Sequence, residues 1–238
     1  MIRVSLPIGG FIRQSLIDYP GHIASVVFLI GCNMRCYYCH NPQLVLPDLI
    51  KTQNLIPVGE LISWFKRNAD LLDAVVVTGG EPTLHPSLPD FLGLLKSFSL
   101  KVKLDTNGTN SGMLEALIDN QLVDYVAMDV KAPLELSKYR AVVGSAFSGI
   151  QLNEVKKSVA ILLKGKVKYE FRTTLNASLN NEDIVEIMTQ VRGDYFLQMP
   201  NENNHGVLIP EQMGECRVDV GQMLDFAKSL QDIQVNVR

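Results

Sequence analysis

Residues 23–40, IASVVFLIGCNMRCYYCH, join an apolar run to a loop that holds three cysteines. The run 23–30 is rich in β-branched residues and ends at a glycine, which predicts a buried strand. Later runs of the same kind predict further strands at 74–77, 101–104, 124–130, 167–173, 194–199 and 233–237. The cysteine loop therefore follows directly from the first predicted strand.

Helical periods separate these strands. Apolar residues recur at i, i+3, i+4 and i+7 within 58–65, 88–95, 184–191 and 220–227. We predict two more helices near 112–122 and 151–163, the second with Asn153 as an early cap. Strand–helix alternation predicts a parallel sheet with right-handed crossovers. About six such units are fewer than the eight of a complete barrel, so we expect an α/β fold, a partial, open (β/α)6 barrel.

The chain shows no internal repeat, low-complexity stretch or linker, so we expect one domain over residues 1–238. Residues 1–22 are predicted to be an N-terminal extension with turns at Gly9-Gly10 and Tyr19-Pro20-Gly21. The barrel core would occupy 23–199. The remaining segment, 200–238, would hold a long polar loop at 200–217, a helix and a strand.

Composition and charge exclude several classes of protein. With 47% hydrophobic and 20% charged residues among 238, the chain is not disordered, collagen-like or a coiled coil. Its formal charge of −3 argues against nucleic acid as a partner. The longest apolar run, 23–30, is too short to cross a membrane, and residues 1–10 lack a secretory signal. We expect a cytoplasmic protein with no membrane partner.

The cysteine spacing favours an iron–sulfur cluster over zinc. Structural zinc takes four ligands, commonly from two distant pairs, and no second pair follows Cys32, Cys36 and Cys39. His40 is adjacent to Cys39, and neighbouring residues rarely point at one metal. A 4Fe–4S cluster held by three cysteines leaves one iron open to a small molecule. Zinc or plain buried thiols remain the alternative, because thiolates suit both metals.

The cysteine motif, with Tyr38 before the last cysteine, resembles the signature of the radical S-adenosylmethionine (SAM) superfamily. The string GCNMRCYYCHNP at 31–42, preceded by SLIDYPG at 15–21, resembles the activating enzymes of glycyl-radical proteins. Among these it is most similar to the long form of anaerobic ribonucleoside-triphosphate reductase activating protein. The resemblance extends through about residue 199. It implies a 4Fe–4S cluster on Cys32, Cys36 and Cys39, with SAM as the second cofactor.

The second predicted strand ends in the sequence TGGEP at 78–82. Paired glycines let the backbone approach a ligand closely, and Glu81 offers a carboxylate to an ammonium group. The alternative is an ordinary strand-to-helix turn. The resemblance implies that Gly79, Gly80 and Glu81 hold the amino group of SAM.

The third predicted strand ends in DTNG and the fourth in MDVK. From the residues alone, Asp105 or Thr106 could cap the next helix, and Asp129 could form an ion pair with Lys131. Resemblance to pyruvate formate-lyase activating enzyme implies that Asp105, Thr106 and Asp129 line a monovalent-cation site beside the SAM carboxylate. It places Lys131 near the same carboxylate.

The fifth predicted strand carries Arg172, which alternates with Phe171 and is expected to point into the barrel. An inward arginine needs an anionic or polar partner. The resemblance implies the ribose or methionine end of SAM, and the alternative is a salt bridge to Glu170 or to an acid of another strand. Tyr38 and Asn41 are expected to pack on, or hydrogen-bond to, the adenosine.

The resemblance implies a reaction that needs no catalytic side chain beyond the cluster and SAM. A low-potential donor such as flavodoxin would supply one electron, SAM would be cleaved reductively, and a glycine of a large partner enzyme would lose hydrogen. The expected partner is anaerobic ribonucleotide reductase, whose glycine loop would meet Asp18 of the SLIDYPG segment.

Three alternatives remain from the sequence. A formate-lyase-like enzyme could be the partner instead. The chain could be a radical SAM enzyme that acts on a small molecule. Last, it could be a zinc-stabilised α/β scaffold that binds another protein without catalysis.

Overall fold

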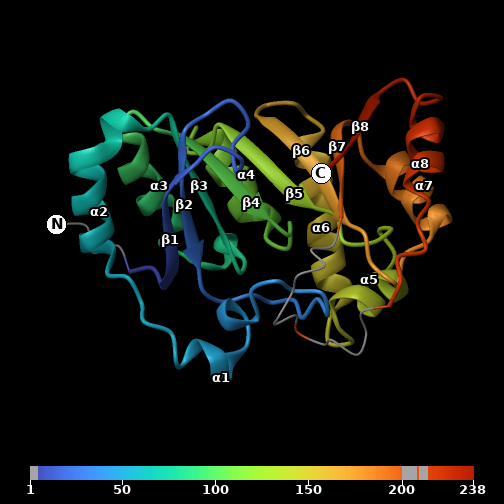
Figure 1. Ribbon diagram of the computed structural model, residues 1–238, viewed down its shortest axis with the longest axis horizontal. Coiled ribbons are helices and arrows are strands. Elements are labelled where there is room, and N and C mark those ends of the chain that lie inside the picture. The colour runs from blue at the N-terminus through green and yellow to red at the C-terminus, as the bar shows by residue number, and fades with distance from the viewer. Residues whose placement is uncertain (1–4, 200–207, 209–213) are drawn as a thin grey trace. The chain divides into compact units, whose positions relative to one another are not determined.

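The computed structural model describes residues 5–199, 208 and 214–238, and Figure 1 shows its ribbon. The fold is α/β, and its strands form one open, mixed eight-stranded sheet in the order β1 to β8. The predicted fold class is therefore confirmed. Most of the predicted polar loop at 200–217 lies outside the described residues.

The strands follow the predicted runs closely, with one addition at the N-terminus. They are β1 (Ile8–Ser15), β2 (Ala24–Leu29), β3 (Ala74–Gly79), β4 (Lys101–Thr106), β5 (Tyr125–Asp129), β6 (Lys168–Thr174), β7 (Gly193–Gln198) and β8 (Ile233–Val237). β1 pairs with β2 antiparallel, whereas β2–β3, β3–β4, β6–β7 and β7–β8 are parallel pairs. The predicted parallel pairing is confirmed for these pairs.

All the predicted helices are present. The helices are α1 (Pro47–Ile50), α2 (Val58–Asn68), α3 (Leu88–Lys96), α4 (Ser111–Asp119), α5 (Leu136–Val143), α6 (Gly149–Leu162), α7 (Asn181–Gln190) and α8 (Val220–Ala227). Short 3-10 turns lie at Pro42–Leu44, Ala69–Leu71 and Pro82–Leu84. The short helices α1 and α5 were not predicted. Figure 1 shows α7 and α8 side by side, next to β7 and β8.

The chain divides into two compact units, each described here by itself. Unit 1 comprises residues 1–33, 43–106 and 112–126, and unit 2 comprises residues 34–42, 107–111 and 127–238. Cys32 belongs to unit 1, whereas Cys36 and Cys39 belong to unit 2.

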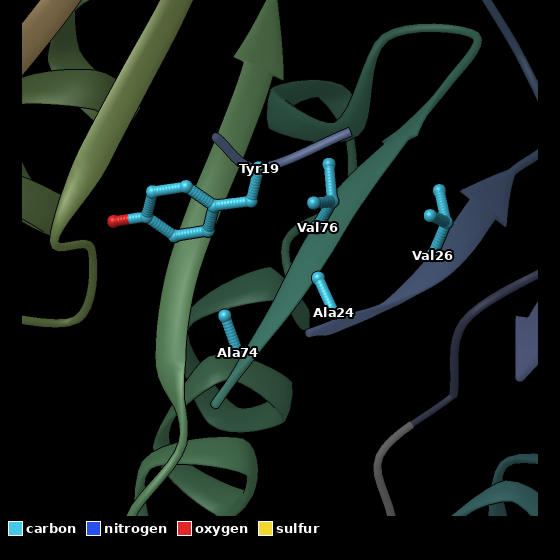
Figure 2. Close-up of a cluster of buried hydrophobic side chains, with 5 residues drawn as sticks. All are labelled: Tyr19, Ala24, Val26, Ala74 and Val76. Carbon is cyan, nitrogen blue, oxygen red and sulfur yellow. The ribbon is translucent and has the colours of Figure 1, made fainter. Parts of the chain in front are cut away.

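A small apolar cluster covers one face of the strands in unit 1 (Figure 2). Its buried members come from the loop after β1 and from facing positions of β2 and β3: Tyr19, Ala24, Val26, Ala74 and Val76. The residues between them, such as Val27 and Val75, are also fully buried, so the strands are covered on both faces. This explains why β2 and β3 read as continuous apolar runs rather than as alternating patterns.

The N-terminal prediction was wrong in part, because Gly9-Gly10 lies inside β1 and forms no turn. A Cβ on Gly9 would meet the side chains of Ile30 and Leu44 at 2.6–2.8 Å. The pair therefore lets β1 pack tightly, next to an irregularity in its register with β2. The predicted turn at Tyr19-Pro20-Gly21 is present, since His22 N–H donates to the Tyr19 carbonyl at 3.0 Å and Gly21 has a φ of 74°.

The cap predicted for the helix at 151–163 was also wrong. Helix α6 begins earlier, and its N-cap is Ser148. The Ser148 hydroxyl accepts from the Gln151 N–H at 3.2 Å, while the Gln151 side chain accepts from the Ser148 N–H at 2.9 Å. This reciprocal pair is a capping box. Asn153 lies on the exposed side of the helix.

No helix in the part of the chain that the structure describes combines the length and the apolar character needed to cross a bilayer.

Replacement of Ser148 by Ala is expected to lower the free energy of unfolding by about 1 kcal/mol, because it leaves helix N–H groups without acceptors. Urea denaturation followed by circular dichroism measures the change. Asn153→Ala is the matched control in the same helix and should have little effect. An equal loss in both variants would contradict the assignment of the cap.

Candidate functional site

In unit 1, the ends of β2 and β3 are joined by backbone hydrogen bonds. Gly80 N–H donates to the Leu29 carbonyl at 2.8 Å, and Glu81 N–H donates to the Gly31 carbonyl at 2.7 Å. A Cβ on Gly80 would collide with the Gly31 carbonyl, and Gly79 has a φ of 113°. Glycine is thus required here by close approach and by backbone conformation. The Gly-Gly pair holds the start of the cysteine loop against the end of β3.

Glu81 is completely buried, and its carboxylate is held by hydroxyl groups. Its Oε1 accepts from the Thr83 hydroxyl at 2.6 Å, the Thr83 N–H at 3.1 Å and the Thr106 hydroxyl at 2.7 Å. The sequence also allowed an ordinary turn at this position, and a turn is present: the Glu81 side chain caps the 3-10 turn that begins at Pro82. The structure brings Glu81 and Thr106 together at the ends of β3 and β4.

Asp105, also at the end of β4, forms an ion pair that the sequence analysis missed. The Lys103 ammonium lies 2.7 Å from Asp105 Oδ1. The signal in the sequence was a lysine two residues before an aspartate in a strand, which places both side chains on one face.

In unit 2, three predicted site residues form one charged cluster at the ends of β5 and β6. The Asp129 carboxylate accepts from Lys131 Nζ through Oδ2 and from Arg172 Nε through Oδ1, both at 2.8 Å. Both alternatives left open for these residues, an Asp129–Lys131 pair and a partner for Arg172 on another strand, are therefore present. Glu170 pairs with Arg238 instead, at 2.7 Å.

These contacts shift the pKa values of the cluster. Burial opposes ionisation of Asp129, but the Arg172 guanidinium and the Lys131 ammonium hold its pKa well below the usual range. Burial also acts against the charged form of Lys131, but the Asp129 carboxylate raises its pKa well above the usual value. All three groups are therefore charged at neutral pH.

Tyr38 is buried beside this cluster. Lys131 Nζ lies 5.9 Å from the centre of its ring. Its hydroxyl oxygen is buried and has no hydrogen-bond partner among the described residues. Burial raises the pKa of Tyr38 well above its usual value, so the phenol is neutral. An unpartnered buried hydroxyl at a strand-end cluster points to a group that the polypeptide itself does not supply.

Charged side chains act electrostatically on the two cysteines of unit 2. Cys39 N–H donates to the Cys36 carbonyl at 3.0 Å, so the loop turns between them. Burial raises the pKa of the half-buried Cys39 thiol, while the Asn41 N–H, Lys131 and Arg35 act to lower it. Burial is the largest of these effects, so the neutral thiol of Cys39 is favoured in this structure.

No group of three His, Cys, Asp or Glu side chains within the described segments is already arranged to hold a metal ion.

Asp18 lies apart from these residues in the sequence, in the loop after β1. Its carboxylate accepts from the Ser15 hydroxyl, and its N–H donates to the same oxygen at 3.3 Å. Leu16 and Ile17, between them, are exposed by 68% and 84%. The loop therefore presents two apolar side chains next to a carboxylate.

Comparison with known proteins identifies relatives over most of the chain. The sequence model of the Radical SAM superfamily matches residues 26–191. A protein of Methanocaldococcus jannaschii named as a glycyl-radical enzyme activating enzyme is 36% identical over 190 residues, which are 78% of this chain and 75% of that protein. The pyruvate formate-lyase-activating enzyme of Clostridium pasteurianum is 29% identical over 190 residues, 75% of this chain and 74% of that protein.

A solved structure shares the fold at low identity. SuiB of Streptococcus suis, in its crystal structure bound to S-adenosylmethionine, superposes with a TM-score of 0.66 at 13% identity. The match covers 90% of this chain, and this chain spans about half (51%) of the length of SuiB.

Replacement of Gly80 by Ala is expected to cost about 1–3 kcal/mol of unfolding free energy, because the new Cβ would force β2 and β3 apart. Gly59→Ala is the matched control, since a Cβ there meets nothing within 4 Å and lies in α2. That control should be neutral or gain up to about 1 kcal/mol. Chemical denaturation of both variants gives the comparison, and a tolerated Gly80→Ala would contradict the close approach.

A second prediction concerns the effect of the Tyr38 hydroxyl on stability. Tyr38→Phe should leave the stability of the chain unchanged or slightly higher, because the lost hydroxyl has no partner among the described residues. Tyr195→Phe is the control, since the buried Tyr195 hydroxyl donates to Thr173 Oγ1 at 2.7 Å. It should lose about 1 kcal/mol. Thermal unfolding of the two variants under identical conditions tests this, and an equal loss would show that Tyr38 is hydrogen-bonded within the chain.

Proposed function

We propose that this chain activates an anaerobic ribonucleotide reductase. The chain belongs to the radical SAM superfamily and, within it, to the glycyl-radical-enzyme activating enzymes. The enzyme class follows from the family itself. The partner, the electron donor and the roles of individual residues are proposals. The observation that carries the residue roles is the group of side chains in unit 2, where thiols, a phenol with no partner among the described residues and paired charges lie together, whereas the choice of partner rests on sequence strings.

The residues present fit the cofactors of this superfamily, a 4Fe–4S cluster and SAM. Cys32, Cys36 and Cys39 would hold the cluster, because soft thiolates are the ligands that iron–sulfur clusters take. Burial raises the pKa of the Cys39 thiol in spite of Lys131 and Arg35, so a bound metal would itself have to stabilise the thiolate. When bound, the two cofactors supply a carbon-centred radical by one-electron cleavage of SAM.

The strand-end charges suit the two ends of the methionine part of SAM. In unit 1, Glu81 with Gly79 and Gly80 would receive the ammonium group, because a carboxylate and close backbone complement a positive charge. In unit 2, Lys131 and Arg172 would receive the carboxylate. Among the described residues, they carry two positive charges against the one negative charge of Asp129, which suits an anionic group.

The adenosine part of SAM would meet aromatic and amide groups. Tyr38 offers a buried ring and a hydroxyl that no described residue satisfies. Asn41, two residues after Cys39, would add an amide hydrogen bond. No side chain is required as an acid or base, so the residues act by binding and orientation and by exclusion of water.

The loop after β1 is the proposed contact with the partner. The adjacent exposed side chains of Leu16 and Ile17 support this proposal, because a partner would remove them from water. Asp18 next to them would hydrogen-bond the backbone of an incoming glycine loop. The choice of ribonucleotide reductase over a formate lyase rests on the SLIDYPG and GCNMRCYYCHNP strings. We further propose a low-potential donor such as flavodoxin.

We also propose that the chain acts as one domain over residues 1–238. The superfamily match at 26–191 takes in parts of both compact units, which supports a single working unit rather than two independent ones.

Electron paramagnetic resonance tests the proposed function directly. The chain, reconstituted anaerobically and mixed with reductant, SAM and anaerobic ribonucleotide reductase, should produce the doublet of a glycyl radical on the reductase. Cys36→Ala should abolish both the doublet and SAM cleavage, because it removes one of three cluster ligands. Circular dichroism should show that the α/β fold of this variant remains.

Cys216→Ala is the matched control. This thiol is half-buried and lies outside the cysteine loop, so the variant should keep its activity. A doublet on a formate lyase but not on the reductase would make the proposed partner wrong. SAM cleavage that a metabolite stimulates, with no radical on either protein, would favour the small-molecule alternative.

A further inference from the structure

Lys103 is a lysine inside the protein. Its side chain is only 2% exposed, although it lies in the middle of β4. Lysine is almost never buried unless its charge is paired, because the ammonium loses its hydration. The pair here is with Asp105, at 2.7 Å, whose side chain is 17% exposed.

The surroundings of Lys103 explain why it needs that partner. Lys103 aligns with Val76 of β3, which aligns in turn with Val26 of β2. Both valines belong to the apolar cluster under Tyr19 (Figure 2). The aliphatic stem of Lys103 therefore lies along an apolar row, and its ammonium group reaches the strand end, where it meets Asp105.

This pairing changes the role that resemblance assigned to Asp105. Asp105 and Asp129 were predicted to line a monovalent-cation site, yet each carboxylate already has a side-chain cation within its own unit. Asp105 has Lys103, and Asp129 has both Lys131 and Arg172 at 2.8 Å. An alkali cation next to either carboxylate would face an ammonium or guanidinium group of like charge. The donor set does not fit a free cation.

We propose that Lys103 is a built-in counter-ion that replaces an alkali cation beside Asp105. The chain should therefore bind SAM without added sodium or potassium. Lys103 acts through Asp105, so it is a positioning residue and not a catalytic one. The part of this inference that concerns SAM rests on the proposed function, whereas the replacement of a cation by Lys103 does not.

Binding of SAM to the reconstituted enzyme should be the same in potassium chloride, sodium chloride and choline chloride at equal ionic strength. Lys103→Met keeps a flexible apolar side chain and removes the positive charge that pairs with Asp105. In choline chloride this variant should bind SAM about tenfold more weakly. Potassium or sodium should restore the binding, because a small cation can now occupy the position of the ammonium.

Two matched variants isolate the charge. The double variant Lys103→Met/Asp105→Asn removes both members of the pair and should show no response to alkali cations. Lys101→Met changes an exposed lysine of the same strand, whose Nζ lies 2.9 Å from His22 Nε2. This variant should behave as the wild type.

Thermal unfolding provides a readout that does not depend on SAM. Potassium should raise the melting temperature of Lys103→Met but not that of the wild type or the double variant, relative to choline. Stimulation of the wild type by potassium, or a Lys103→Met variant that is destabilised without any rescue by cations, would overturn the inference. If the wild type bound no SAM in any salt, the proposed function would be wrong, and the melting temperatures would still decide the role of Lys103.

Discussion

The need to neutralise buried charge constrains the strand ends of this protein more than any other interaction. Lys103 with Asp105, and Asp129 between Lys131 and Arg172, are groups that water cannot solvate fully. Removal of one member of such a pair leaves an uncompensated charge, at a cost of about 3–5 kcal/mol. The polar groups are therefore held in fixed positions before any ligand binds. Around Asp129, the two described cations outnumber the one described carboxylate, which suits an anionic ligand end.

A second constraint is steric and acts through the backbone. The ends of β2 and β3 approach so closely that Gly80 has no room for a side chain beside Gly31. The same contact orients the N–H of Glu81 toward the Gly31 carbonyl. Because Gly31 immediately precedes Cys32, the first cysteine emerges from a rigid point, whereas the rest of its loop lies in the other unit. The paired glycines thus anchor the cysteine loop at one end as well as opening the backbone to a ligand.

Strands that are buried on both faces have continuous apolar sequences, which can be recognised without knowing which residues face which side. The strands of the parallel sheet could be predicted for this reason. β2 and β3 are such runs. β1 gave no such signal, since IGGFIRQS contains two glycines, is mostly half-buried or exposed and lies at an antiparallel edge. The glycines were taken for a turn, although their role is to let two strands pack closely. The cap of α6 was missed for a related reason: Ser148 lies before the periodic apolar residues, and only its hydrogen bond with Gln151 identifies it.

At the candidate site, the side-chain partners could not be predicted from the sequence. The sequence draws attention to these polar residues because each follows a recognisable strand, but the partners that they contact depend on which strands face one another. Arg172 lies two residues from Glu170 on the same strand, but the two side chains do not pair with each other. Arg172 pairs with Asp129, and Glu170 pairs with Arg238. Lys103 and Asp105 are the opposite case, in which two residues of one strand do pair; the row of β3 that aligns with Lys103 is apolar. The availability of a carboxylate to an added cation therefore depends on the side chains around it in the folded sheet. A sequence motif that contains only the carboxylate cannot predict it.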